Sequence, residues 1–256
     1  MPYPFLIFAF ILGAVIGSFL NVCIYRVPAG ESVISPPSRC PKCDAGIRWY
    51  QNIPVLSWFF LRGRCASCKA PISGRYPAVE ALTGGLFVLV LWTFEFQAAT
   101  LVYWIFVSAL VVITFIDLDH QIIPDVISLP GIPVGFVCSF FVPWLSWTDS
   151  LLGILIGGGS LYLVAFLYEL LTKKEGMGGG DIKLLAMIGA FLGWKAVFPV
   201  IFFSSLLGTL VGVPVMLAQK ADSRLAIPFG PFLALGSLIY LFWGYAIISW
   251  YLSFFS

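Results

Sequence analysis

Two aspartates at the edges of apolar segments are the side chains of this sequence best suited to chemistry. Asp117 ends one long apolar run, and Asp181 begins another. A charge at such a depth costs roughly 2.5–3.5 kcal/mol on insertion scales, so each acid indicates a functional site. Two carboxylates at equal depth can share a proton, because like charges a few ångströms apart cannot both ionise cheaply. One would then activate a water while the other, protonated, polarises a carbonyl. The pair predicts peptide hydrolysis without a metal or a covalent nucleophile.

A glycine run, residues 176–180 with Met177 at its second position, leads directly to Asp181. Glycine has no Cβ, so this backbone lets another chain approach closely. The alternative is that Asp181 only caps the N-terminus of the helix that begins at Ile182. The second acid at matching depth favours the catalytic interpretation.

Other polar side chains offer weaker chemistry. His120 is the only histidine of the chain, and Ser204 has no identifiable partner, so serine or cysteine catalysis is disfavoured. Asp119 should face away from Asp117 on a helix, because it lies two residues further along the chain. Asp125 follows Pro124 and suits a helix cap better than catalysis.

Four of the six cysteines form two C-x-x-C pairs separated by twenty-one residues, Cys40 with Cys43 and Cys65 with Cys68. This spacing lets four thiolates close a tetrahedral Zn²⁺ site, which would be structural because no position stays open. A redox dithiol is the alternative, but no thioredoxin-like pattern surrounds either pair. Cys23 and Cys138 are expected to be packing residues.

The composition is that of a helical membrane protein. Of the 256 residues, 60% are hydrophobic and only 10% are charged, with a mean hydropathy of +1.00. We expect an all-α polytopic fold with about eight transmembrane helices. No internal repeat is evident. Asn21 and Ser18 should hydrogen-bond to neighbouring helices. The expected spans are 5–24, 78–97, 100–117, 127–147, 150–171, 182–194, 197–218 and 229–253, with a weak break at Gly193-Trp194-Lys195.

Basic residues set the orientation of these spans. With both termini outside, thirteen of the fourteen Lys and Arg residues lie at cytoplasmic ends or loops, and only Lys195 lies outside. The positive-inside rule supports this topology. We expect a first helix over 1–27, a cytoplasmic cysteine domain over 28–77 and a peptidase domain over 78–256. The thirteen are Arg26, Arg39, Lys42, Arg48, Arg62, Arg64, Lys69, Arg75, Lys173, Lys174, Lys183, Lys220 and Arg224.

Taken together, these segments resemble a known family. Gly178-Gly179-Gly180-Asp181 with an upstream aspartate resembles the GxGD membrane aspartyl proteases. The match to prepilin peptidases, also called type IV leader peptidases, covers nearly the whole chain in order. It adds the double C-x-x-C loop and the stretches Gly17-Ser18-Phe19-Leu20-Asn21-Val22, Arg75-Tyr76-Pro77-Ala78-Val79-Glu80 and Asp117-Leu118-Asp119-His120.

The resemblance implies an enzyme of the bacterial inner membrane that cleaves prepilins or pseudopilins after a glycine, on the cytoplasmic side. Asp117 and Asp181 match the catalytic pair of the family. Members with the cysteine domain also methylate the new N-terminus with S-adenosylmethionine. No G-x-G-x-x-G follows a strand here, so we take Glu80 as the candidate contact. The alternative for Glu80 is a buried charge satisfied by Arg75 or by a backbone group.

Two other classes of function stay open from the residues alone. A proton-coupled transporter could use the two aspartates as a relay, but it would more often show broken helices in symmetric halves. A zinc-bearing scaffold without catalysis is the third interpretation. We expect the lipid bilayer and a prepilin or pseudopilin as partners, and no nucleic acid; the sequence does not fix the oligomeric state.

Overall fold

The structure is a computed structural model of the chain, and it describes residues 2–173, 178–219 and 228–253. Within these residues the secondary structure is helical, apart from two isolated β-bridges. The expected all-α fold is therefore confirmed. Residues discussed above that lie outside the described ranges are Lys174, Gly176, Met177, Lys220 and Arg224.

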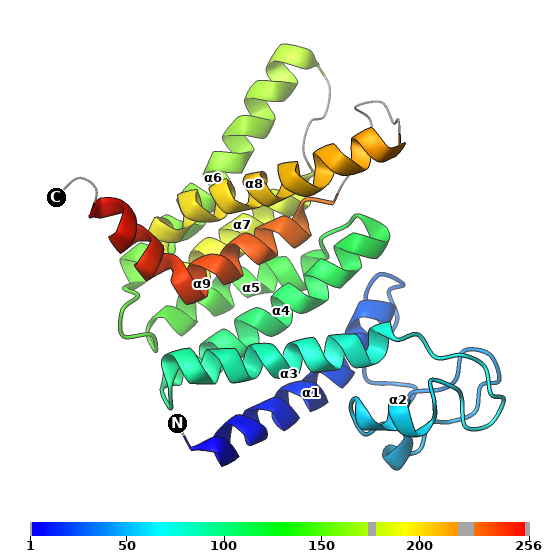
Figure 1. The fold of residues 1–256 in the computed structure, drawn as a ribbon. Coiled ribbons are helices and arrows are strands. Elements are labelled where there is room, and N and C mark those ends of the chain that lie inside the picture. The colour runs from blue at the N-terminus through cyan, green and yellow to red at the C-terminus, as the bar shows by residue number, and fades with distance from the viewer. Residues whose placement is uncertain (1, 174–177, 220–227, 254–256) are drawn as a thin grey trace. The chain divides into compact units, whose positions relative to one another are not determined.

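Each of the eight expected spans contains one long helix, and the cysteine loop adds short helical pieces (Figure 1). In chain order the elements are α1 (Tyr3–Arg26), the 3₁₀ helix η1 (Trp49–Gln51), α2 (Leu56–Phe60), α3 (Arg75–Phe94), α4 (Ala98–His120), α5 (Asp125–Ser139), α6 (Trp147–Thr172), α7 (Gly179–Leu192), α8 (Trp194–Gln219) and α9 (Gly230–Leu252).

Six of these helices, among the residues described, are long and apolar enough to cross a membrane: α1, α3, α4, α6, α8 and α9. The other two long helices, α5 and α7, have 15 and 14 residues. Both are shorter than the about 20 residues that span a hydrocarbon core. The expected fourth span, 127–147, is wrong at its end, because α5 stops at Ser139 before a turn containing Pro143.

The break between α7 and α8 falls at Gly193, as expected. Its φ of 80° lies in the left-handed region that favours glycine. α7 ends at Leu192, and α8 begins directly after the glycine, at Trp194. A single residue therefore separates two helices that would otherwise be read as one span.

The chain forms two compact units, Met1–Val112 and Ile113–Ser256, so α4 begins in the first and ends in the second. In the first unit α1 packs antiparallel against α3. A Cβ on Gly13 would lie 2.8 Å from the Cα of Gly84, and one on Gly17 would lie 2.8 Å from the Cα of Glu80. Small residues spaced by four let two helices approach this closely.

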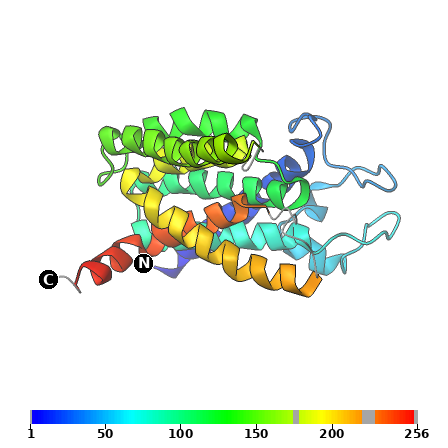
Figure 2. The ribbon, with the colours of Figure 1, turned by 90° about the horizontal axis from the view of Figure 1, so that it is seen from above.

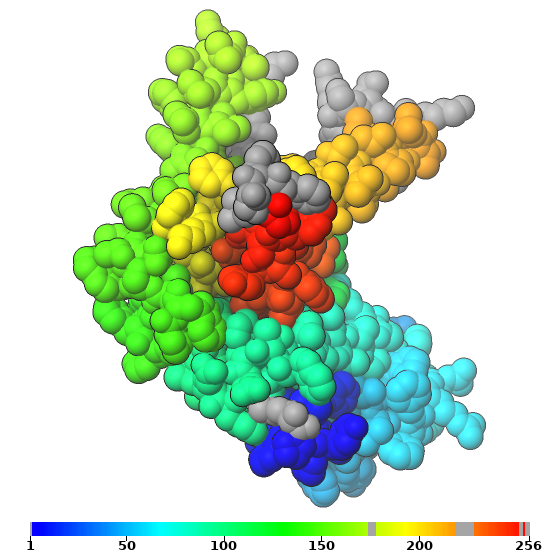
Figure 3. Space-filling model, turned by 60° about the vertical axis from the view of Figure 1, so that its left-hand side comes forward, coloured from blue at the N-terminus to red at the C-terminus, as the bar shows by residue number. Residues whose placement is uncertain are grey.

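The second unit is built around α7, which contacts α5, α6, α8 and α9 (Figures 1 and 2). Its residues Leu184 to Phe191 are all buried. α6 crosses α7 where Gly153 faces Gly189, and a Cβ on either glycine would overlap the backbone of the other. Beyond this crossing, the C-terminal parts of α6 and α8 project separately (Figure 3). The middle and end of this short helix are thus surrounded on several sides, and Asp181 lies in its first turn, where burial is partial.

Candidate active site

The two predicted catalytic aspartates lie at helix ends in the same unit. Asp117 is in the last turn of α4 and is 4% exposed. Asp181 is in the first turn of α7 and is half-buried. Their carboxylates are close enough for their charges to interact. The structure thus brings together two acids that are 64 residues apart in the chain, 181 minus 117.

A third helix end holds Asp117 in place. The backbone N–H of Gly230, the first residue of α9, donates a hydrogen bond of 2.9 Å to Oδ2 of Asp117. A Cβ at this position would lie only 2.5 Å from the same oxygen. A side chain there would displace the carboxylate, so the close approach requires glycine.

Ile123, in the turn between α4 and α5, connects both sides of the acid pair. A Cβ on Gly180 would lie 2.9 Å from the Cβ of Ile123, and one on Gly230 would lie 3.3 Å from its Cδ1. Asp181 is the next residue after Gly180. One apolar side chain therefore packs against both the helix start that carries Asp181 and the helix start that binds Asp117.

The alternative that Asp181 caps α7 is wrong. The residue before the helix is Gly178, no side chain caps it, and Asp181 is the third helical residue. The helix-cap interpretation of Asp125 is also wrong, since the cap residue is Pro124 and Asp125 begins α5. Both oxygens of Asp125 instead accept from Nζ of Lys183, at 2.7 and 2.8 Å. This exposed ion pair connects α5 to α7 two residues from Asp181.

The remaining polar candidates have other surroundings. Asp119 and His120 are exposed, so Asp119 faces away from the buried Asp117, as expected. The hydroxyl of Ser204 donates to the carbonyls of Val200 and Phe232. It is a buried packing group and carries no triad.

In the first unit the four predicted metal ligands meet. The Sγ atoms of Cys40, Cys43, Cys65 and Cys68 all lie within 4.8 Å of one another. Four thiolates at about 2.3 Å from a Zn²⁺ ion would be about 3.8 Å apart, and Sγ of Cys40 is 3.9 Å from that of Cys68. The thiolate is the metal-binding form of cysteine. The cluster can hold a metal ion.

Glu80 lies in the first unit and not with the aspartates. It is 8% exposed, and its Oε2 accepts from the backbone N–H of Val55 at 2.7 Å. A backbone group therefore contacts this carboxylate, as expected for a buried charge, and whether Glu80 also contacts a cofactor stays a prediction. Asn21 of α1 donates to the carbonyl of Tyr76 at 3.1 Å, which confirms its predicted contact with a neighbouring helix.

Comparison with known proteins assigns the family. Residues 104–213 match the model of the type IV leader peptidase family, and residues 11–94 match that of the bacterial peptidase A24 N-terminal domain. A relative from Stutzerimonas stutzeri, named prepilin leader peptidase/N-methyltransferase, is 40% identical over 99% of this chain and 96% of its own. The chain belongs to the type IV leader peptidase family.

Relatives of the same name agree with this assignment. The protein from Aeromonas hydrophila is 40% identical over 99% of this chain and 96% of its own. The protein from Myxococcus xanthus is 44% identical over 84% of this chain and 64% of its own. No solved structure matches the chain. Membership of the leader peptidase family supports peptidase chemistry and leaves the transporter alternative without support.

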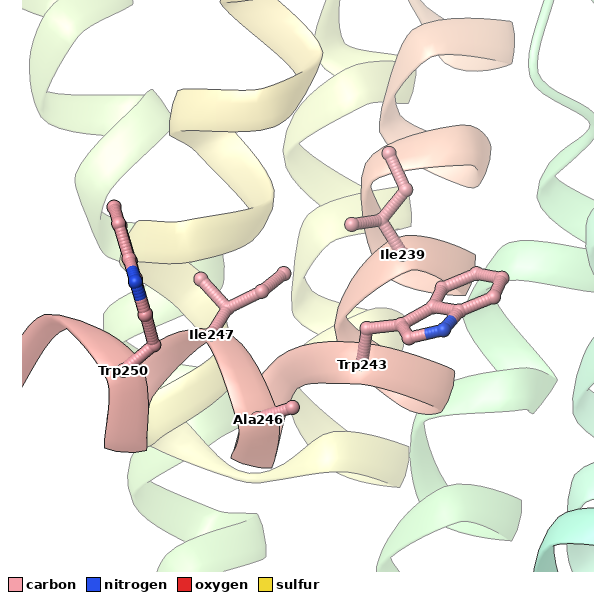
Figure 4. A pocket seen from close by; sticks show the side chains of 5 residues that line it. All are labelled: Ile239, Trp243, Ala246, Ile247 and Trp250. Atoms are coloured by element: carbon pink, nitrogen blue, oxygen red, sulfur yellow. The ribbon is translucent and has the colours of Figure 1, made fainter.

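A hollow along the last helix of the leader peptidase chain carries no chemistry. It has a volume of about 390 Å³ and lies along α9, lined by Ile239, Trp243, Ala246, Ile247 and Trp250 (Figure 4). Every one of these side chains is apolar or an indole. Tryptophans of this kind are enriched where a helix meets the membrane interface.

Sequence reasoning missed two contributors to the acid pair of this leader peptidase. Gly230 acts through its backbone N–H, and Ile123 acts through its apolar volume, so neither offers a chemical signal in the sequence. It also missed a short repeat in the cysteine loop, Cys40–Ile47 and Cys65–Ile72, which share cysteines, alanine and isoleucine at equivalent positions. In both, the first cysteine N–H donates to the carbonyl of that alanine, at 3.0 and 2.8 Å.

Proposed function

We propose that this membrane-bound leader peptidase uses Asp117 and Asp181 to hydrolyse the leader of a prepilin or pseudopilin after a glycine, and N-methylates the new N-terminus. Membership of the family supports both activities. The observation that carries the mechanism is the meeting of three helix ends, those of α4, α7 and α9, around two carboxylates.

The two aspartates divide the hydrolytic work. One ionised carboxylate takes a proton from water, whose oxygen attacks the peptide carbonyl. The other carboxyl, protonated, donates a hydrogen bond to the carbonyl oxygen on which negative charge develops. The proton then passes to the leaving amine. Because the N-terminal ends of α7 and α9 carry partial positive charge, they stabilise the negative charge shared by this pair.

The placement of the pair suits a substrate that is half in the membrane. The aspartates are at the ends of helices, so an extended peptide reaches them without unwinding deep in the bilayer. A basic leader held outside the hydrocarbon would leave its scissile bond level with Asp117 and Asp181. The positive-inside rule supports a cytoplasmic location for this end and an inner-membrane location for the chain.

The cysteine domain over 28–77 has a supporting role in this proposal. Four thiolates closing on one ion suit Zn²⁺ and leave it no position for substrate, so the metal stabilises the loop. The peptidase domain over 78–256 contains both aspartates. S-adenosylmethionine, when bound, supplies an activated methyl group for transfer to the new amine. Carboxylate and carboxamide groups around Glu80 have the chemistry to bind such a molecule.

Asparagine substitution tests the two-aspartate mechanism. Asp117→Asn and Asp181→Asn keep the side-chain size but cannot take up a proton, so each should abolish the shortening of a prepilin by the purified enzyme. Asp119→Asn, two residues from Asp117 and exposed, is the matched control and should cleave like wild type. Cleavage at the wild-type rate by either site variant would exclude the mechanism. A gel-shift assay on substrate and product measures the outcome.

A further inference from the structure

The first unit contains a pocket with a volume of about 760 Å³, formed by α1, α3 and the cysteine loops. The volume falls within the range of about 300–1,000 Å³ that is typical of small-molecule sites. Ser18, Asn21, Tyr76 and Glu80 of the two helices contribute to its lining, and Cys40 and Cys65 contribute from the loops. A pocket of this size, beside a four-cysteine cluster that can hold a metal ion, is large enough to hold a small-molecule ligand.

The tight crossing of α1 and α3 determines which polar groups reach this pocket. Gly17 lies against the Cα of Glu80. Ser18, the next residue of α1, and Asn21, one turn further along, both line the pocket next to α3. Asn21 donates its N–H to the carbonyl of Tyr76, and a carboxamide also carries an acceptor oxygen. Three polar side chains from two apolar helices thus line one pocket.

The backbone at Val55 reaches Glu80 through a strained conformation. Val55 has a φ of +63°, which a β-branched residue rarely adopts, and its N–H donates to Oε2 of Glu80 at 2.7 Å. Strain of this kind persists where the surroundings over-determine it, and it is concentrated at functional sites. The Ser18 side chain also hydrogen-bonds to this carboxylate. A carboxylate offers about four acceptor positions, so bonds from Val55 and Ser18 leave capacity for a ligand.

We propose that this pocket binds S-adenosylmethionine, with Glu80 accepting hydrogen bonds from the ribose hydroxyls. The proposal rests on the N-methyltransferase activity proposed above. A buried acid that accepts from ribose hydroxyls is the usual recognition of a nucleoside in dinucleotide-binding proteins. The negative charge of Glu80 also favours a ligand that carries a sulfonium cation.

The aromatic side chain of Trp58 supports the same ligand. Trp58 lines the pocket, and its Nε1 donates to the carbonyl of Ile72 at 3.1 Å. A Cβ on Gly63 would lie 2.9 Å from the indole, so this glycine makes room for the ring. A fixed indole offers a flat apolar face to an adenine. Its position depends on the loop that contains Cys65 and Cys68, so the metal would act on cofactor binding through Trp58.

Binding of S-adenosylhomocysteine, the demethylated form of the cofactor, tests the site. The full chain in detergent is dialysed against radiolabelled S-adenosylhomocysteine, as wild type, Glu80→Gln and Glu95→Gln. Loss of a charge-assisted hydrogen bond should weaken binding about tenfold or more in Glu80→Gln. Glu95, at the other end of α3, is exposed and outside the pocket, so its variant should bind within about twofold of wild type.

Photolabelling of the wild-type chain with S-adenosylmethionine provides a second measurement that needs no variant. The label should map to peptides within 18–26, 51–58 or 65–80. Suppose that wild type methylates a prepilin, but the label maps elsewhere and Glu80→Gln binds S-adenosylhomocysteine like wild type. The cofactor site proposed here is then wrong, while the proposed function stands. If wild type cleaves a prepilin but binds no S-adenosylhomocysteine, the methyltransferase function fails and the site fails with it. Occupation of the pocket by a leader peptide that S-adenosylhomocysteine does not displace would also overturn the proposal.

Discussion

Gly178, Gly179 and Gly180 precede Asp181, but they meet different surroundings. A Cβ on Gly179 would contact nothing within 4 Å, and one on Gly178 would lie 3.9 Å from the carboxylate of Asp181. A Cβ on Gly180 would lie 2.9 Å from the Cβ of Ile123, which is closer than real Cβ atoms approach. Of these three positions, only position 180 requires glycine, because only there would a Cβ overlap a neighbouring side chain.

Alanine at position 180 should therefore impair cleavage. Ile123 is branched at its Cβ and cannot move away from the new methyl group without moving the turn, so the first turn of α7 would shift with Asp181. Displacement of a catalytic group by about 1 Å can cost about 10²-fold in rate. We expect Gly180→Ala to lower kcat for prepilin cleavage by about tenfold or more.

Gly179→Ala is the matched control for this substitution and should stay within about twofold of wild type. Equal activity of the two alanine variants would show that the contact between Gly180 and Ile123 does not position Asp181. Thermal unfolding of both variants separates a local shift from a general loss of stability.

At the scale of single residues, the sequence predicts the two acidic side chains better than it predicts the groups that contact them. Asp117 and Asp181 are conspicuous because a charge at the edge of an apolar run is costly. The hydrogen bond from Gly230 to Asp117 joins residues that are 113 positions apart and uses a backbone group that every residue except proline has. Likewise, nothing in the sequence pairs Asp125 with Lys183, since both are ordinary charges at helix ends.

The two cysteine knuckles are the elements whose structure depends most directly on a ligand. Between Arg26 and Arg75 the structure has only two short helices and two isolated β-bridges. A loop with few buried contacts has little stability of its own, so bound metal would supply much of it. The loop contains Arg39, Lys42, Arg48, Arg62, Arg64 and Lys69 as trypsin sites.

Removal of the metal should therefore expose this loop to protease. We expect a chelator, or the substitution Cys43→Ser, to speed tryptic cleavage within residues 39–69 by about tenfold. Cys138→Ser is the control, because Cys138 lies in α5 outside the cluster, and it should leave the rate unchanged. Metal content by mass spectrometry should fall from one zinc per chain to none in Cys43→Ser. Unchanged proteolysis after complete metal loss would argue against a structural role.

Across the whole molecule the pattern of spans was predictable, including the short one that became α7, and the length of the fourth was not. Hydropathy located all eight long helices, since each contains a long apolar stretch with few charges. It overestimated the fourth span, because apolar residues continue through the turn after Ser139 and the sequence does not mark which of them are helical. α7 is short because Gly193 ends it, and buried helices need not match the thickness of the bilayer.

The eight-span topology predicts that the turn after α5 faces the outside. Phe141 is in this turn and is exposed, so Phe141→Cys in a Cys138→Ser background should react with a membrane-impermeant maleimide added to intact cells. Asp119→Cys, at the cytoplasmic end of α4, should react only after the membrane is permeabilised. Protection of Cys introduced at position 141 until permeabilisation would show that α5 does not cross.

The bond between Gly230 and Asp117 also sets the moment at which the enzyme can first act. A ribosome adds about 5–20 residues per second, so about 6–23 seconds pass between the synthesis of Asp117 and that of its donor, 113 residues later. A nascent chain that already contains both acids still has an unrestrained carboxylate. We therefore expect the enzyme to be inactive until α9 has been synthesised, because the N–H group of Gly230 completes the surroundings of Asp117.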